Sequence, residues 1–119
     1  IASDDSVEEL PFTEMVALAD TGKGKKVYGK CKACHKLENG INGTGPHLYN
    51  IVDRPQASIE EYAYSTALSS MTGIWSEDEL NAFLLKPSNY APGTKMSYSG
   101  LKDINDRANL VAYLKNTTE

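Results

Sequence analysis

The chain has 119 residues, with 12 basic and 16 acidic side chains and a net charge of −4, which suits a single domain and argues against a nucleic-acid binder. The sequence has no run of about 18 apolar residues, which excludes a membrane-spanning helix within it. Leu, Ile, Val and Phe make up only about a fifth of the residues, so we expect something besides aliphatic side chains to fill part of the core.

Charge is distributed unevenly along the chain. Residues 1–22 carry six acidic side chains and no basic one, whereas residues 23–36 carry six lysines and no acidic one. A concentrated basic segment in an acidic protein predicts a docking surface for an acidic partner, with a solvated helix face as the plain alternative. The first residues lack the basic start of a signal peptide. We therefore expect that a leader was removed or that an export or anchor segment precedes residue 1.

The N-terminal half predicts two helices and a long loop. Residues 1–11 are acidic and irregular, and a short helix is expected to follow through residue 19 with Thr13 as its N-cap. Asp20 can cap a second helix, which leads towards the two cysteines of the chain. Glycine and proline then mark residues 37–57 as a loop.

Two capping-box patterns mark the C-terminal half. The sequence from Ser58 predicts a helix to about residue 68, and the sequence from Ser76 predicts another that is stopped by Pro87. Residues 87–102 are predicted as loop, and a last helix is predicted from about 103 to 116. Because no segment alternates with period 2, we predict an all-α fold of about four to five helices. Loops this long are unusual in a small domain unless they wrap a bound group.

The two cysteines form the motif Cys31-Lys-Ala-Cys34-His35. Thiols at i and i+3 of a helical turn reach neighbouring positions on one flat ligand, and His35 adds an imidazole. This pattern is typical of c-type haem attachment, with two thioether bonds and one axial nitrogen ligand. The alternatives are a zinc site, for which His47 is the spare histidine, a thioredoxin-like redox pair, which lacks its βαβ context, and a coincidental motif.

A haem that carries electrons needs a second axial ligand, and three methionines are available. Met15 lies in the first predicted helix, where a core position is favoured, and Met71 lies in a turn. Met96 ends a loop that Pro92 stiffens, and a thioether, which is a weak ligand for ferric iron, needs such a preset loop. We therefore predict Met96 as the ligand opposite His35.

The chain from about residue 20 to residue 115 resembles class I cytochromes c of the mitochondrial and large bacterial type. The segment 12–20 is similar to the part that joins the haem domain to its tether in membrane-anchored bacterial cytochromes c of the c-y type. The motifs that carry the resemblance are Gly24-Lys-Lys-Val-Tyr28, Cys31-Lys-Ala-Cys-His35, Thr44-Gly-Pro46, Arg54, Tyr64, Trp75, Pro87, Tyr90, Pro92-Gly-Thr-Lys-Met96 and Arg107-Ala-Asn-Leu-Val-Ala-Tyr-Leu114.

The resemblance implies a cytochrome c fold, with a lead-in over 1–19 and a haem domain over 20–119. It implies one haem c bound covalently through Cys31 and Cys34. Gly24 and Tyr28 would cross the last helix near Leu110 and Tyr113.

The resemblance also implies roles for residues around the haem. The Pro46 carbonyl would accept a hydrogen bond from His35, and Arg54, Tyr64 and Trp75 would surround the propionates. Tyr90 and Thr94 would support the Met96 loop. Phe83 stands where the family often has a tyrosine, and His47 is expected at the surface. The side chains expected to wrap the haem are Leu48, Leu84, Leu85 and Leu110.

By resemblance, the protein is a monohaem electron carrier rather than an enzyme, and a peroxidase-like or gas-sensing haem domain is the rival hypothesis. Lysines would surround the haem edge and dock on a cytochrome bc1-type, quinol-oxidising complex and on a terminal cytochrome c oxidase; these are Lys30, Lys32, Lys36, Lys86 and Lys95. We expect a monomer in the bacterial periplasm, with a membrane tether preceding residue 1 in an anchored form.

Overall fold

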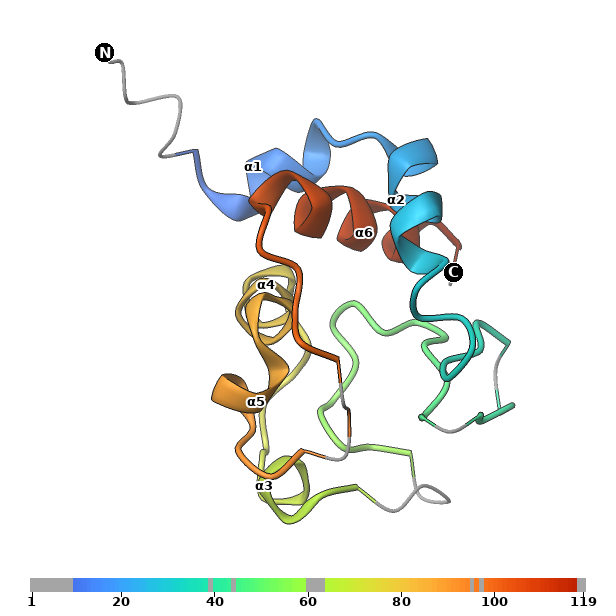
Figure 1. Ribbon diagram of the computed structural model, residues 1–119, viewed down its shortest axis with the longest axis vertical. Helices are drawn as coiled ribbons and strands as arrows, with labels where there is room; N and C mark the ends of the chain where they lie inside the picture. The colour runs from blue at the N-terminus through green and yellow to red at the C-terminus, as the bar shows by residue number, and fades with distance from the viewer. Residues whose placement is uncertain are drawn as a thin grey trace.

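The computed structural model describes residues 10–38, 40–43, 45–59, 64–94, 96 and 98–117, and these form six α-helices joined by long loops (Figure 1). The helices are α1 (Phe12–Ala17), α2 (Thr21–Tyr28), α3 (Thr66–Ser69), α4 (Glu77–Leu85), α5 (Pro87–Tyr90) and α6 (Ile104–Thr117). Strand-like pairing in the described residues is limited to one bridge between Pro55 and Ile74. The predicted all-α fold is confirmed.

Two helix starts follow from local capping chemistry. The Asp20 carboxylate accepts the Lys23 N–H at 3.1 Å, and the Ser76 hydroxyl accepts the Glu79 N–H at 3.1 Å. Each side chain satisfies a backbone donor that the first helical turn leaves free. The predicted starts of α2 and α4 are therefore confirmed.

Three local predictions were wrong. Thr13 lies inside α1, which begins directly after Pro11. The helix predicted from Ser58 is absent at 58–59 and at 64–65, and α3 begins only at Thr66, where Ser65 accepts the Leu68 N–H. The rest of that capping box, residues 60 and 61, lies outside the described residues.

The third error concerns the segment after Pro87, which was predicted as loop and forms the single turn α5. Proline at the first helical position has no N–H to leave unpaired, and its fixed φ suits a helix start. Pro87 therefore both ends α4 and begins α5. As a result, the described residues form six helices instead of the expected four to five.

α1, α2 and α6 form a helical layer at the top of Figure 1, where α2 crosses α6. At the crossing, a Cβ on Gly24 would lie 2.7 Å from the Asn109 carbonyl carbon and 2.8 Å from Tyr113 Cβ. Only glycine permits this backbone approach. The rings of Tyr28 and Tyr113 pack beside it with centroids 5.7 Å apart, so the predicted crossing is confirmed.

α1 packs on α6 and α4 through Phe12 and Val16, which are 6% and 5% exposed. With α4 it extends the core that Val111 and Leu114 form on α6. No helix in the part of the chain that the structure describes is long and apolar enough to cross a bilayer.

The loops on either side of α3 and α5 build the other half of the molecule (Figure 1). Residues 53–56 pair with 73–75 through backbone hydrogen bonds, including Trp75 N–H to Arg54 O at 2.8 Å and Gln56 N–H to Gly73 O at 2.9 Å. The segment after the Met96 loop is pinned to α4 by the bond from Leu101 N–H to Leu84 O at 2.8 Å. These bonds fix the loops to one another and to α4, and a cavity lies between the loops and the helical layer.

Candidate functional site

A cavity of about 530 Å³ lies between the helical layer and the loops. Nine of the ten residues predicted to form the cofactor site line it: Cys31, Cys34, His35, Pro46, Arg54, Tyr64, Trp75, Thr94 and Met96. Apolar side chains complete the lining, among them Leu48, Leu84 and Leu110. Leu85 was expected beside them, but it is 48% exposed and does not line the cavity.

The cysteine motif continues α2 as a further helical turn. The Cys31 carbonyl accepts the N–H groups of Cys34 at 3.1 Å and of His35 at 2.9 Å. This turn brings both thiols to one wall of the cavity, and both are free. Burial, and secondarily the neighbouring thiol, raise the pKa of Cys31.

The His35 ring is held from two sides. Its Nδ1 lies 2.8 Å from the Pro46 carbonyl oxygen, and because a carbonyl can only accept, Nδ1 carries the proton. Nε2 is then left with a free lone pair, as metal coordination requires. A Cβ on Gly45 would lie 2.8 Å from Nδ1, so the ring occupies space that only glycine leaves open. Burial lowers the pKa of His35, against the opposing effect of the bond to Pro46.

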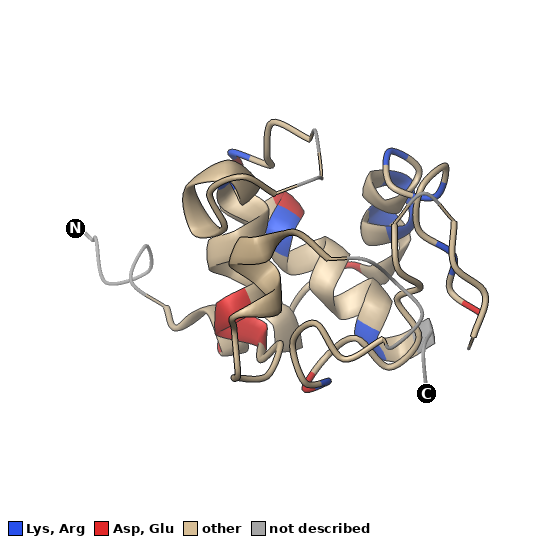
Figure 2. Ribbon diagram, turned by 90° about the horizontal axis from the view of Figure 1, so that it is seen from below, with Lys and Arg blue, Asp and Glu red and all other residues tan. Residues whose placement is uncertain are grey.

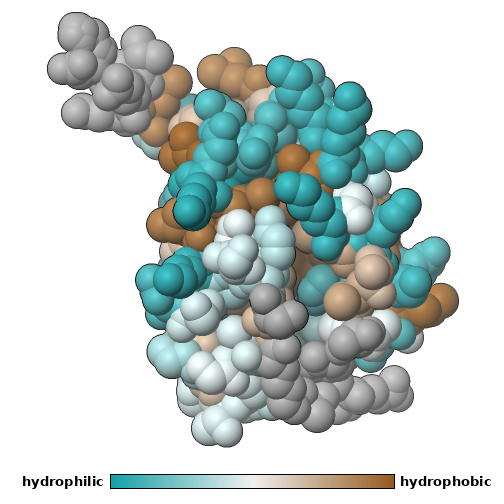
Figure 3. Space-filling view, viewed as in Figure 1, coloured by the Kyte–Doolittle hydropathy of each residue, from teal (hydrophilic) through white to brown (hydrophobic). Residues whose placement is uncertain are grey.

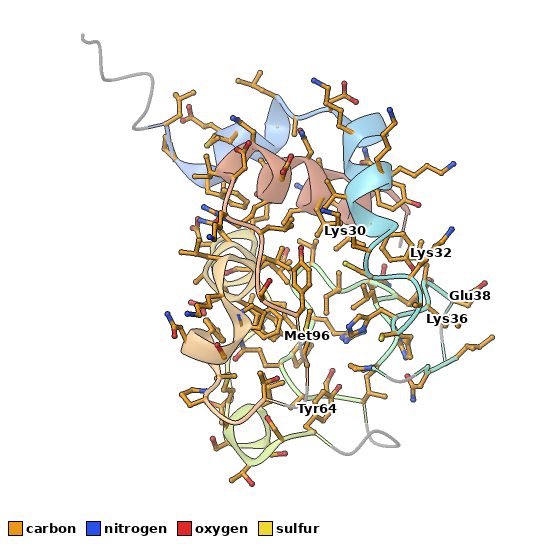
Figure 4. All side chains as sticks on the ribbon, viewed as in Figure 1. Lys30, Lys32, Lys36, Glu38, Tyr64 and Met96 are labelled. Atoms are coloured by element: carbon orange, nitrogen blue, oxygen red, sulfur yellow. The ribbon has the colours of Figure 1, made fainter. Side chains whose placement is uncertain are left out.

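Met96 also lines the cavity, and Figure 4 shows it near the centre of the molecule. The Thr94 hydroxyl accepts the Met96 N–H at 3.3 Å, and Gly93 adopts a positive φ of 83°. A left-handed glycine and a side-chain hydrogen bond thus shape the approach to the thioether.

Arg54 and His47 form a buried polar corner beside the cavity. Arg54 Nη1 donates to the carbonyls of His47 at 2.8 Å and Tyr49 at 3.1 Å, while its buried Nε has no hydrogen-bond partner. A buried, unpaired guanidinium N–H on a cavity wall favours an anionic group there. His47 was expected at the surface, but it is 5% exposed because its backbone is fixed by Asn42 and Arg54.

Aromatic rings close the far end of the cavity. Trp75 packs against Phe83 with centroids 5.1 Å apart, and both line the cavity. Tyr90 is the tenth predicted residue, and it does not line the cavity. Its ring packs on Trp75 at 5.6 Å and on Phe83 at 5.7 Å, so it contacts the residues of the wall instead of the space within. Tyr90 thus lies behind the cavity wall, and its predicted role in supporting the Met96 loop stays a prediction.

These observations fit a haem. The lining offers two thiols, an imidazole lone pair and a thioether, and the largely apolar space they border is also bordered by an unpaired guanidinium N–H. An imidazole and a thioether are a donor set that a haem with two axial ligands would use. A zinc site does not fit, since no group of three or more His, Cys, Asp and Glu side chains within the described residues could hold an ion.

Several contributors to the site escaped sequence reasoning. Gly45 makes room for the His35 ring, and the Tyr28 hydroxyl donates to the His35 carbonyl at 2.6 Å. The proximity of Gly45 to the Cys-His motif was a usable signal. The Tyr28 contact has no such signal, because it depends on how the turn after α2 folds back.

The predicted docking lysines begin at the mouth of the cavity. Lys30 contributes to its lining, and Lys32 and Lys36 are exposed on the same segment (Figure 4). Figure 2 shows the lysines of α2 and the following segment gathered at one end of the molecule. Lys86 is exposed after α4, and Lys95 lies outside the described residues.

Comparison with known proteins places this site in a family. Residues 22–118 match the family described as cytochrome c. The chain is 46% identical over 110 residues to a cytochrome c homolog of Rickettsia prowazekii, an alignment that covers 92% of this chain and 63% of that protein. It is 44% identical over 96 residues to a c-type cytochrome cy of Rhodobacter capsulatus, covering 80% of this chain and 48% of that protein.

A solved structure gives the same result for the fold. Cytochrome cH from Methylobacterium extorquens superposes with a TM-score of 0.77 at 35% identity, covering 82% of this chain and 99% of that one. The chain spans less than two thirds of the length of the Rickettsia prowazekii relative and about half of the Rhodobacter capsulatus one.

Proposed function

The chain belongs to the cytochrome c family, whose members bind a covalently attached haem c, and on that premise we propose that it is a monohaem electron carrier with His35 and Met96 as axial ligands. The observation that supports the proposal is that the His35 ring and Met96 line the same cavity as the two thiols. When bound, the haem supplies reversible one-electron exchange between ferric and ferrous iron.

Each side chain has a defined task in this proposal. Cys31 and Cys34 attach the group covalently, and Pro46 orients the His35 ring through the bond to Nδ1. Arg54, Tyr64 and Trp75 border the propionates, where the unpaired Arg54 Nε can donate to a carboxylate. Thr94 fixes the backbone of Met96. Two fixed axial ligands exclude water and substrates from the iron, which suits electron transfer rather than bond chemistry.

The test is ligand access to the iron of the holo protein. We expect a reduced low-spin spectrum that does not change when CO is added, together with a ferric Met–iron band. Met96→Ala should lose that band and bind CO, whereas Met71→Ala, a methionine outside the cavity lining, should behave as the parent protein. Rapid CO binding by the parent protein would contradict the proposal and favour a haem enzyme or gas sensor.

We propose further that the lysines near the cavity mouth dock on acidic redox partners, namely a cytochrome bc1-type complex and a terminal cytochrome c oxidase. The support is the exposure of Lys30, Lys32 and Lys36 beside the cavity. The triple change of these lysines to Glu should slow association about tenfold or more and flatten its dependence on ionic strength. Lys102→Glu, at an exposed position outside the lining, is the matched control. A flat salt dependence in the parent protein would contradict this docking surface.

For location we propose the bacterial periplasm, because haem attachment to a Cys-Lys-Ala-Cys-His motif takes place outside the cytoplasm. We also propose that residues 1–19 lead from a membrane tether into a haem domain over 20–119. The likeness to the c-type cytochrome cy of Rhodobacter capsulatus supports this arrangement. The sequence encoded upstream of residue 1 tests it: a long uncleaved apolar helix is expected, and a cleavable leader would contradict the tether.

A further inference from the structure

The hydroxyl of Tyr90 joins three parts of the molecule that are distant in sequence. Gln56 Nε2 donates to the Tyr90 oxygen at 2.8 Å, and the Tyr90 hydroxyl donates to the Glu79 carboxylate. Gln56 belongs to the loop before α3, Glu79 to the first turn of α4, and Tyr90 to the end of α5. One phenol thus has both its acceptor and its donor capacity used by separate elements.

The Gln56 end of this arrangement is rigid. Gln56 is 9% exposed, and its backbone N–H bonds to Gly73 O at 2.9 Å. It therefore lies on the paired segments 53–56 and 73–75, which carry Arg54 and Trp75 to the cavity wall. Any group that is fixed to Gln56 is fixed relative to that wall.

Hydrogen bonds along the following segment connect Tyr90 to Met96. Ala91, which is 0% exposed, donates its N–H to Pro87 O at 2.9 Å, and Thr94 N–H donates to Ala91 O at 2.9 Å. Met96 N–H then donates to the Thr94 hydroxyl at 3.3 Å. Because these hydrogen-bonded turns are consecutive, the position of Met96 depends on the position of Tyr90.

We propose that Gln56 and Glu79 are positioning residues for Met96: by holding the Tyr90 hydroxyl from two sides, they fix the start of the loop that presents the sixth ligand. The inference rests on the proposed role of Met96 as that ligand. Neither residue lines the cavity, so both act through Tyr90. Burial and the bond to Glu79 raise the pKa of Tyr90 from an ordinary value that already lies well above neutral pH, so the phenol is a protonated donor.

The test is the affinity of the ferric holo protein for imidazole, which competes with Met96 and reports how often the loop opens. Tyr90→Phe removes both hydrogen bonds and keeps the ring, and should raise the imidazole affinity about tenfold. Glu79→Ala should raise it severalfold, while Glu79→Gln, whose amide oxygen can still accept, should restore most of the parent behaviour. Asp78→Ala, in the same exposed turn, should change nothing.

A double-mutant cycle separates positioning from general support of the fold. If Glu79 acts through Tyr90, then Glu79→Ala adds nothing in the Tyr90→Phe background, whereas unrelated contributions would add. Phe12→Ala is a second control: it should lower the unfolding temperature without raising imidazole affinity. Unchanged affinity in Tyr90→Phe, or fully additive effects, would overturn the inference.

Met96→Ala, measured in parallel, keeps the two proposals distinguishable. A large gain in imidazole affinity there, with none in Tyr90→Phe, overturns the positioning inference alone. No gain in Met96→Ala means that Met96 is not the ligand, and then the proposed coordination falls together with the inference that rests on it.

Discussion

The helical layer (α1, α2 and α6) and the loop half (the loops on either side of α3 and α5) bury their apolar side chains in different ways. In the helical layer, α2 and α6 meet backbone to backbone at Gly24, and Val111 is 0% exposed among its neighbours. In the loop half, Leu48, Ile51 and Trp75 face the cavity instead of another layer of side chains. The first half packs largely on its own side chains and adds Tyr28, Leu110 and Leu114 to the cavity wall, whereas the second supplies the facing wall of a core that the haem would complete.

The difference accounts for the small share of aliphatic residues in the sequence. A chain that binds a large apolar group needs fewer Leu, Ile, Val and Phe side chains to exclude water from its centre. Within the helical layer the surface is not uniform: Figure 3 shows hydrophobic residues over α1 and hydrophilic ones over α2. Substitutions in the two halves test this difference between them.

Gly24→Ala should be the most damaging single change in the helical layer. The added Cβ would meet the Asn109 backbone, which cannot move without shifting α6, and we expect a loss of about 3 kcal/mol or more. Gly22→Ala is the matched control in the same helix, because its Cβ would meet only the Asp20 carboxylate at 3.1 Å. Chemical denaturation should show that variant between neutral and about 1 kcal/mol more stable. Equal effects at the two glycines would contradict the close crossing.

Phe12→Ala tests whether α1 belongs to the closed core. The side chain is 6% exposed against α6 and α4, and we expect a loss of about 2 to 3 kcal/mol. This is below the 3–5 kcal/mol typical of such truncations because a short terminal helix can detach instead of leaving a cavity. Leu18→Ala, at a position that is 79% exposed, should change the denaturation midpoint negligibly. An unchanged denaturation midpoint in Phe12→Ala would show that α1 does not contribute to the core.

The smallest expected effect is the pH dependence of stability caused by His47, whose ring is buried in the loop half. Burial, and secondarily Arg54, lower the pKa of His47 below its ordinary 6.5. The unfolded chain then binds more protons than the folded one, so the stability from the neutral ring is complete above pH 6.5 and declines as the pH falls below it. Between pH 7 and pH 5, the parent protein should lose more denaturant resistance than His47→Asn. Identical losses would show that His47 is not buried as a neutral ring.

The parts of the structure that could be predicted from the sequence are those determined by residues close to one another in the chain. Asp20 and Ser76 cap helices through side chains three residues from their donors, and the Cys31–His35 turn is equally local. His47 was misplaced because its burial depends on how the loop around it folds, and the contacts of the Tyr90 hydroxyl could not be predicted because they come from residues far along the chain. The burial of His47 depends on Arg54, and the hydroxyl of Tyr90 is held by Gln56, 34 residues away. No local pattern marks such contacts.

The loop half is expected to need the haem to fold, whereas the helical layer packs largely on its own side chains even though it lines part of the cavity. Hydrogen exchange of the holo protein and of a Cys31→Ala/Cys34→Ala chain, which cannot attach the haem, measures this directly. We predict that amide protection in the second protein disappears across 45–57 and 98–101 and persists in part along α2 and α6. Native protection in those loops without haem, or an equal loss in both halves, would contradict the account.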